Sequence, residues 1–209
     1  MKKILLSVTL VMGLGVFGVV NINAQDAQEV SFGVKGEANM SNFNISDMPG
    51  VKSDFGVGAT IGGFAKIDFN QHFALQPELL FHWQNSTLKF NGLKNDFQYW
   101  GVEIPVYAVG QMKLASGDRA YIGIGPYARL GFSAENTTGD VNLYKEYGNA
   151  KAFMHRGDIG AGAMIGYEFA FGMQINASYK YGFLNTLDAD SDNSTMTNQM
   201  ISLGIGYRF

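Results

Sequence analysis

The feature that most constrains this chain is an alternation of apolar residues with polar or small ones, repeated over most of its length. Residues 201–209 read ISLGIGYRF, and residues 171–183 read FGMQINASYKYGF. Successive side chains of a β-strand point to opposite faces, so a period of two sorts them into one apolar and one polar face. A helix, with a period of 3.6, would not sort them. These segments are therefore predicted to be strands.

Eight such runs follow one another along the chain. They cover residues 30–40, 55–69, 72–83, 100–109, 121–132, 158–169, 171–183 and 201–209. An even number of runs, each about ten residues long, is typical of a closed barrel in a bacterial outer membrane. We therefore predict an all-β fold, an eight-stranded antiparallel up-and-down transmembrane β-barrel.

A soluble barrel is the competing interpretation, because its apolar face would line a ligand cavity and its polar face would meet water. The apolar face of these runs is nearly free of charge, and charged residues make up only 16% of the chain. Aromatic residues gather at the two ends of the apolar face, where a membrane barrel carries its interfacial girdles. The predicted girdle residues are Phe55, Phe69, Phe73, Trp83, Trp100, Phe132, Phe169, Phe171, Tyr181 and Phe183.

The connections between the runs alternate in length. Short joins fall at residues 70–71, at 113–118 and around Ala170, whereas the long joins are 41–53, 86–96, 135–152 and 185–198. Short periplasmic turns and long extracellular loops are the arrangement of outer-membrane barrels. The pattern predicts four extracellular loops, with both termini in the periplasm.

The polar face carries balanced charges, six positive and six negative. They are Lys35, Lys66, Arg129, Arg156, Lys180 and Arg208, with Glu37, Asp68, Glu78, Glu103, Asp158 and Glu168. The interior of an eight-stranded barrel is just wide enough for side chains to fill, and unpaired charges there would be costly. We expect an interior ion-pair network that plugs the barrel. A gated proton or ion path is the functional alternative.

The N-terminus has the pattern of a secretory signal peptide. Lys2 and Lys3 precede an apolar run over residues 4–20, and Ala24 provides a small residue for cleavage. The prediction is a signal peptide at residues 1–24 and a barrel domain at residues 25–209. A retained membrane helix is the alternative, although the run is marginal in length for one.

Candidates for chemistry are few. The chain has no cysteine and a net charge of −3, which excludes thiol catalysis and argues against binding of nucleic acid. Of the three histidines, His82 and His155 are expected near the outer rim, with Ser86 close to His82, but nothing in the spacing defines a catalytic triad. Asp188, Asp190 and Asp192 form only a weak metal-site candidate, because Asn193 stands where a calcium loop needs glycine. We expect no enzyme activity and no cofactor.

Five stretches resemble the PorT-like family of outer-membrane β-barrels found in Bacteroidota-type bacteria. They are GVKGEANMS at 33–41, LQPELL at 75–80, VEIP at 102–105, GIGPY at 123–127 and LGIGYRF at 203–209. The resemblance implies an eight-stranded outer-membrane barrel and no single activity, although some members are similar to a component of protein secretion. Ile205, Tyr207 and the terminal Phe209 are also similar to the signal read by the barrel-assembly machinery.

Three functions remain open on the sequence. The first is a structural or interaction barrel whose loops contact surface partners or lipopolysaccharide within the lipid bilayer. The second is an accessory of a secretion or envelope-assembly complex. The third is a barrel hydrolase acting on lipid or peptide, which requires a histidine beside a serine or a carboxylate at the outer rim.

Overall fold

The structure is a computed structural model, and it describes residues 29–46, 51–90, 93–136, 156–185 and 195–209. The regular elements in these ranges are all β-strands. They are β1 (Glu29–Ser46), β2 (Val51–Asp54), β3 (Gly56–Asp68), β4 (Phe73–Phe90), β5 (Leu93–Lys113), β6 (Arg119–Asn136), β7 (Gly157–Glu168), β8 (Met173–Gly182) and β9 (Thr195–Arg208). The predicted signal peptide at residues 1–24 lies outside the described residues.

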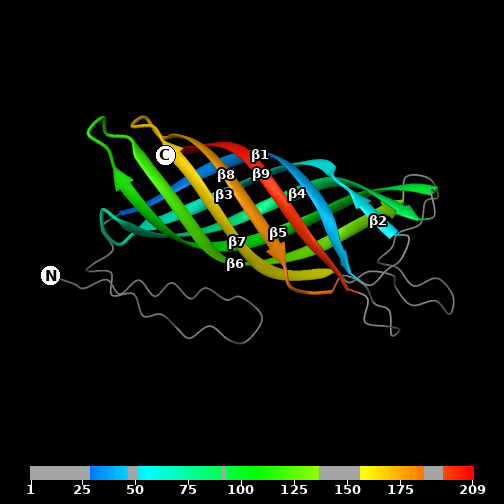
Figure 1. Ribbon diagram of the computed structural model, residues 1–209. Helices are drawn as coiled ribbons and strands as arrows, with labels where there is room; N and C mark the ends of the chain where they lie inside the picture. Colours follow the sequence, from blue (N-terminus) through cyan, green and yellow to red (C-terminus); the bar gives the residue numbers. More distant parts are fainter. Residues whose placement is uncertain (1–28, 47–50, 91–92, 137–155, 186–194) are drawn as a thin grey trace.

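The strands form one closed antiparallel sheet (Figure 1). With the short β2 set aside, each strand pairs with its neighbours in sequence, and the cylinder closes where β1 pairs with β9. The short β2 is separated from β3 only by Phe55, and both pair with β4, so the two count as one interrupted strand. The barrel is therefore eight-stranded, which confirms the predicted fold.

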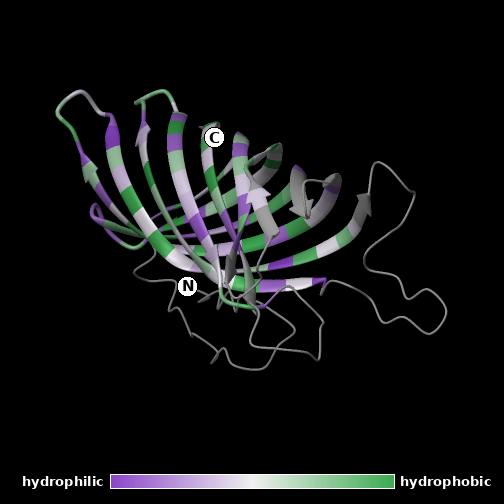
Figure 2. Cartoon of the chain, turned by 45° about the vertical axis from the view of Figure 1, so that its right-hand side comes forward, coloured by the Kyte–Doolittle hydropathy of each residue, from purple (hydrophilic) through white to green (hydrophobic). Residues whose placement is uncertain are grey.

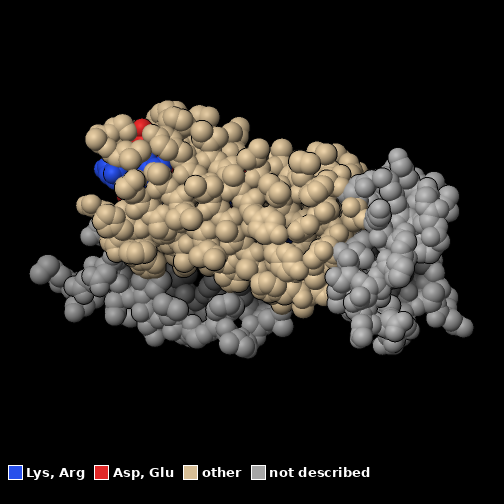
Figure 3. Space-filling view, in the orientation of Figure 1, with Lys and Arg blue, Asp and Glu red and all other residues tan. Residues whose placement is uncertain are grey.

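Figure 2 shows the alternation as hydrophilic and hydrophobic bands that follow one another along the strands. The burial of the residues shows that the apolar side chains lie outside and the polar side chains inside. Ile122, Ile165 and Leu203 are 63%, 62% and 65% exposed on the outer wall, whereas their neighbours in sequence Tyr121 and Ser202 are buried. On the face shown in Figure 3, the charged side chains of the described residues gather at the end that carries the short turns. This uncharged, apolar wall is suited to hydrocarbon. Within the described residues, no helix has the length and apolar character needed to cross a bilayer.

The strands on the side of the long connections extend further than the alternation indicates. β4 and β5 pair as far as Phe90 with Leu93, so most of the predicted long loop at residues 86–96 is a β-hairpin, and that prediction was wrong. The part of a strand that extends beyond the hydrocarbon does not need an apolar face. The alternation therefore marks the membrane-spanning part of the strand but not where the strand ends. The predicted short joins are confirmed, because the strands are connected through residues 69–72, 114–118 and 169–172.

Two of the short turns are tied together by one carboxylate. Asp118, in the turn between β5 and β6, accepts hydrogen bonds from the hydroxyls of Ser116 at 2.6 Å and Tyr167 at 2.7 Å. It also accepts one from the backbone N–H of Ala170, in the next short turn, at 2.8 Å. These donors favour the charged carboxylate and lower the pKa of Asp118, with the Ser116 hydroxyl the largest cause.

We expect Asp118→Ala to loosen these turns at neutral pH. A carboxyl group whose pKa is lower in the folded state stabilises that state above its unfolded value, for which 3.8 is the ordinary figure. The stabilisation is lost as the pH falls through the folded pKa. The difference in urea midpoint between wild type and Asp118→Ala, measured at pH 7 and at pH 3, should shrink at the lower pH. A difference that stays equal at both values would show that the charge of Asp118 is unimportant.

Candidate functional site

The barrel interior holds most of the charged residues that the sequence assigned to it. Lys35, Glu37, Lys66, Asp68, Glu78, Glu103, Arg129, Glu168 and Lys180 are buried, and Asp158 and Arg208 are half-buried. Arg156 was wrongly assigned to this group, because it is exposed. It precedes Gly157, where β7 begins, so the inward–outward alternation does not reach it.

Sequence reasoning missed Arg119, which lies in the interior. Its Nη1 is 3.6 Å from Asp68 and 3.7 Å from Glu168, and its side chain is 19% exposed. Arg119 is the first residue of β6 and has the same parity as the inward-facing Tyr121. Extending the strand by two residues would have found it. With Arg119 in place of Arg156, the count of interior side chains among the described residues is still six positive and six negative.

The Glu103 cluster lies towards the long connections. Glu103 is fully buried, and one of its oxygens accepts two hydrogen bonds from the guanidinium of Arg129, at 2.6 and 2.9 Å. Its other oxygen is paired with Lys180, which reaches it from β8 on another side of the lumen. One carboxylate thus joins two buried cations from different strands.

The same carboxylate faces a histidine. Nε2 of His82 lies 3.5 Å from Glu103, and Nδ1 of His82 is hydrogen-bonded to the Thr60 hydroxyl at 2.8 Å. Asn39 donates a hydrogen bond to that hydroxyl at 2.7 Å. The order hydroxyl, imidazole, carboxylate matches that of a nucleophilic triad. However, His82 is only 1% exposed and lies inside the barrel, so its expected place near the outer rim was wrong.

The Glu78 cluster lies beside β1. The ammonium of Lys35 donates to both oxygens of Glu78, at 3.0 and 3.2 Å, and lies 2.8 Å from Glu37. Gln76 donates a further hydrogen bond to Glu78 at 2.8 Å. Two carboxylates therefore share one cation here, with an amide completing the partners of Glu78.

The Glu168 cluster lies at the end of the short turns. Arg208 donates two hydrogen bonds to one oxygen of Glu168, at 2.6 and 3.0 Å, and Gln174 donates to the other at 2.7 Å. The ammonium of Lys66 lies 3.6 Å from the same carboxylate. It also lies over the ring of Tyr121, 5.5 Å from the ring centroid, as a cation–π contact. Charge pairing therefore continues to this end of the lumen.

Large aromatic side chains fill the space between the clusters. In register, Tyr121 faces Gly166 and Tyr127 faces Gly160 across the β6–β7 pair. In each pair a Cβ on the glycine would overlap the tyrosine ring. The glycines therefore leave the room in which the rings lie, and an inward side chain at either position would compete with a ring.

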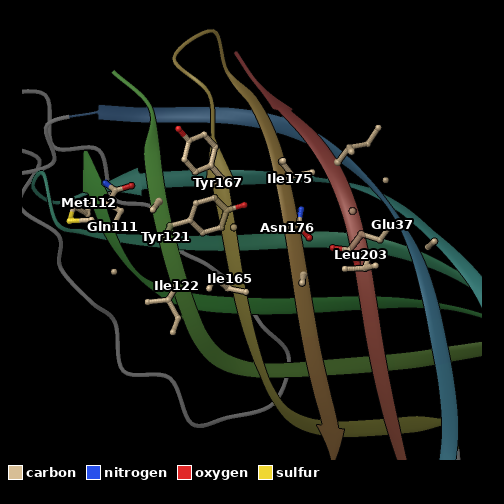
Figure 4. Close-up of a pocket in the computed structure, with 18 of the residues that line it drawn as sticks. Glu37, Gln111, Met112, Tyr121, Ile122, Ile165, Tyr167, Ile175, Asn176 and Leu203 are labelled. Carbon is tan, nitrogen blue, oxygen red and sulfur yellow. The ribbon is translucent and has the colours of Figure 1, made fainter. Parts of the chain in front are cut away.

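A hollow of about 1440 Å³ follows the wall formed by β1 and β4–β9 (Figure 4). Its lining includes Ile122, Ile165 and Leu203, which belong to the exposed outer surface. The hollow is thus open towards the outside of the barrel and is not a closed chamber in the lumen.

The predicted girdle residues point outward at both ends of the barrel. At the short turns, Phe169 stacks on Phe171 with ring centroids 5.5 Å apart. Nearer the long connections, the ring centroids of Trp83 and Trp100 are 6.4 Å apart. At the C-terminus, Ile205, Tyr207 and Phe209 are 60%, 45% and 73% exposed on the outer wall.

The remaining candidates for chemistry do not assemble into a site. The predicted metal candidate, Asp188, Asp190 and Asp192, lies outside the described residues, as does His155. Among the residues that the structure describes, no group of three or more histidine, aspartate or glutamate side chains is placed to hold a metal ion.

Comparisons with known proteins agree with this architecture. The family described as "Outer membrane protein beta-barrel domain" matches residues 12–209. Neisserial surface protein A is 16% identical, with a TM-score of 0.53, over 87% of this chain and 100% of that one. OprG from Pseudomonas aeruginosa is 16% identical, with a TM-score of 0.49, over 86% and 95%. Ail of Yersinia pestis, in complex with the heparin analogue sucrose octasulfate, is 14% identical, with a TM-score of 0.46, over 87% and 99%.

At these identities the likeness to the neisserial protein shows a shared fold. No curated protein sequence matches this chain.

Proposed function

Because the chain belongs to the outer membrane protein β-barrel domain family, we propose that it is a barrel with a plugged polar interior that acts as a structural or interaction protein. It would act through its four extracellular loops, with lipopolysaccharide and surface molecules as their partners. The observation that supports this role is the set of three ion-pair clusters, with aromatic rings between them, inside the described part of the barrel. A barrel filled in this way offers its loops and its outer wall for contact.

Three observations support the plug. The carboxylates Glu78, Glu103 and Glu168, one in each cluster, are at most 3% exposed. The lumen of an eight-stranded barrel has room for side chains and little else. The interior charges of the described residues balance, so this part of the lumen has no excess of one sign to draw an ion through.

We expect the purified full chain to give no large steady currents in planar lipid bilayers. In a plugged lumen the ion pairs and rings would leave no continuous aqueous path wide enough for hydrated ions. Single-channel recording at several voltages is the measurement, with a general porin in the same bilayers as the positive control. Frequent ohmic steps from the purified protein would contradict the plug and favour the ion path.

The orientation that follows from this role puts the short turns and both termini in the periplasm. The aromatic girdles would anchor the wall at the two interfaces, and Ile205, Tyr207 and Phe209 would be read by the barrel-assembly machinery. A signal peptide at residues 1–24 would direct export. Cysteine labelling of intact cells tests this topology: a cysteine placed at Ser116 should be protected, and one in the segment 137–155 should react.

An accessory role in secretion or envelope assembly is the second candidate, and the five stretches that resemble PorT-like proteins favour it. Cross-linking in cells followed by purification of the barrel distinguishes the two roles. Recovery of envelope or secretion proteins on the periplasmic side supports the accessory role, whereas surface molecules support the loop-mediated role.

We propose that the protein is not an enzyme. The triad-like order of Thr60, His82 and Glu103 is closed off inside the barrel, where neither lipid nor peptide could reach the Thr60 hydroxyl. The hydrolase hypothesis requires a histidine beside a serine or a carboxylate at the outer rim. Among the described residues, no histidine has such a partner there.

A further inference from the structure

The lumen has two unlike sides. On one side, Tyr107, Val109, Tyr121 and Met164, with Ala74, form a buried apolar cluster. On the other side, formed by β8, β9 and β1, most inward side chains are small or polar, and Met196 and Met200 of β9 are buried apolar exceptions. The small or polar residues include Gln174, Asn176 and Ser178 on β8, Ser202, Gly204 and Gly206 on β9, and Glu37 and Asn39 on β1.

Several polar groups on this second side have no hydrogen-bond partner among the described residues, and four of them carry the argument. They are the hydroxyls of Ser178 and Ser202, Oδ1 of Asn176 and Oε2 of Glu37. The four side chains are 7%, 1%, 8% and 5% exposed, so bulk water does not complete their hydrogen bonds. Native proteins contain few such groups, and each one needs an explanation.

The register brings these four groups together. Ser178 lies directly opposite Ser202, and in the next inward row Asn176 and Glu37 both lie opposite Gly204. A Cβ on Gly204 would be 2.7 Å from Cγ of Glu37 and 3.1 Å from Oδ1 of Asn176. Both side chains therefore lean over the same glycine from its two sides. Figure 4 shows Asn176 and Glu37 on the two strands that flank β9.

From this arrangement we propose a buried water-binding site between β8, β9 and β1, in which ordered water molecules bridge Ser178, Ser202, Asn176 and Glu37. A buried water needs several polar partners, and the four unpartnered groups on these three neighbouring strands supply them. Each serine hydroxyl can donate or accept a hydrogen bond, whereas the amide and carboxylate oxygens can only accept one. Water suits this set because it both donates and accepts hydrogen bonds.

A small cation would also suit hard oxygen ligands, but the local charge opposes it. The ammonium of Lys35 lies 2.8 Å from Oε1 of Glu37, on the same carboxylate. Lys180 follows Ser178 on the same face of β8, and it is itself buried. Two buried ammonium groups beside the site therefore favour a neutral ligand.

The sign of one stability change tests the proposal. In the double variant Ser178→Ala/Ser202→Ala, loss of hydroxyls that bind water should lower the folded-to-unfolded ratio roughly tenfold, as expected for two lost hydrogen bonds. If the hydroxyls are dry, their removal relieves two unsatisfied groups, and the variant should be more stable than wild type. Urea unfolding of the full chain in detergent micelles or bilayers provides the ratio.

A second readout keeps the test independent of folding yield. In lipid nanodiscs, nuclear Overhauser contacts from long-lived water to the backbone N–H groups of β8 and β9 should be present in wild type and lost in the double variant. Ser31→Ala is the matched control. Ser31 is also buried on β1, but its hydroxyl accepts a hydrogen bond from Arg208, in the Glu168 cluster at the short-turn end of the barrel. It should leave the water contacts unchanged.

Three outcomes would overturn the proposal. The first is a double variant that is more stable than wild type, and the second is a wild type without water contacts at β8 and β9. The third is a rise in stability on adding sodium, potassium or calcium at constant ionic strength that the double variant abolishes, which would assign the site to a cation.

Discussion

Glu103→Ala is expected to destabilise the barrel by about 3–5 kcal/mol, because it leaves buried cations without their carboxylate. Arg129 and Lys180 both depend on Glu103 for their ion pair, and all three are nearly inaccessible to water. The free energy of unfolding in urea, measured in detergent or bilayers, is the quantity to compare.

The matched control is Glu29→Ala. Glu29 is a surface carboxylate 3.9 Å from Arg208, and its side chain is 59% exposed. An exposed pair of this kind contributes about 0–1 kcal/mol. Replacing Glu103, Arg129 and Lys180 together with methionine should recover much of the loss, because no unpaired charge remains. Equal effects of Glu103→Ala and Glu29→Ala would show that the Glu103 cluster adds nothing to stability.

Gly160→Ala should destabilise the protein by about 1–3 kcal/mol, the usual range for overpacking. A Cβ at this position would overlap the backbone oxygen of Tyr181 and lie 2.6 Å from the ring of Tyr127. The ring can shift, but the carbonyl belongs to the ladder between β7 and β8, so relief would disturb the pairing there.

The control for this prediction comes from the same strand. A Cβ on Gly157 would meet nothing within 4 Å, so Gly157→Ala should be nearly neutral or slightly stabilising. Both variants are compared by urea unfolding at the same lipid composition. If Gly160→Ala and Gly157→Ala unfold alike, the ring of Tyr127 does not depend on the space above Gly160.

The period-two pattern was sufficient to predict the architecture, because each face of a membrane barrel has its own solvent. Ile122 and Leu203 had to face hydrocarbon, and Glu103 and Lys180 then had to face the lumen. The pattern carries no such constraint beyond the bilayer, and therefore it missed the pairing of β4 with β5 out to Phe90 and the start of β6 at Arg119.

The partners inside the lumen could not be read from the pattern. Parity tells which face a side chain occupies, but the stagger between strands decides its depth along the barrel axis. Glu103 and Lys180 are 77 positions apart in sequence, and they meet only because the closed barrel brings β5 and β8 to the same depth. Likewise, His82 was placed near a rim because its strand was taken to end just beyond it, whereas β4 continues to Phe90.

The pairing of β1 with β9 has a consequence for biogenesis. These two segments come from opposite ends of the barrel domain, so their hydrogen bonds must wait for the last strand to be delivered. Until then the sheet has two unpaired edge strands. Their free backbone N–H and C=O groups find no hydrogen-bond partner in hydrocarbon. Loop-closure entropy delays a contact between such distant segments. The joining of the first and last strands is therefore expected to be a late step in the insertion of this chain into the bilayer.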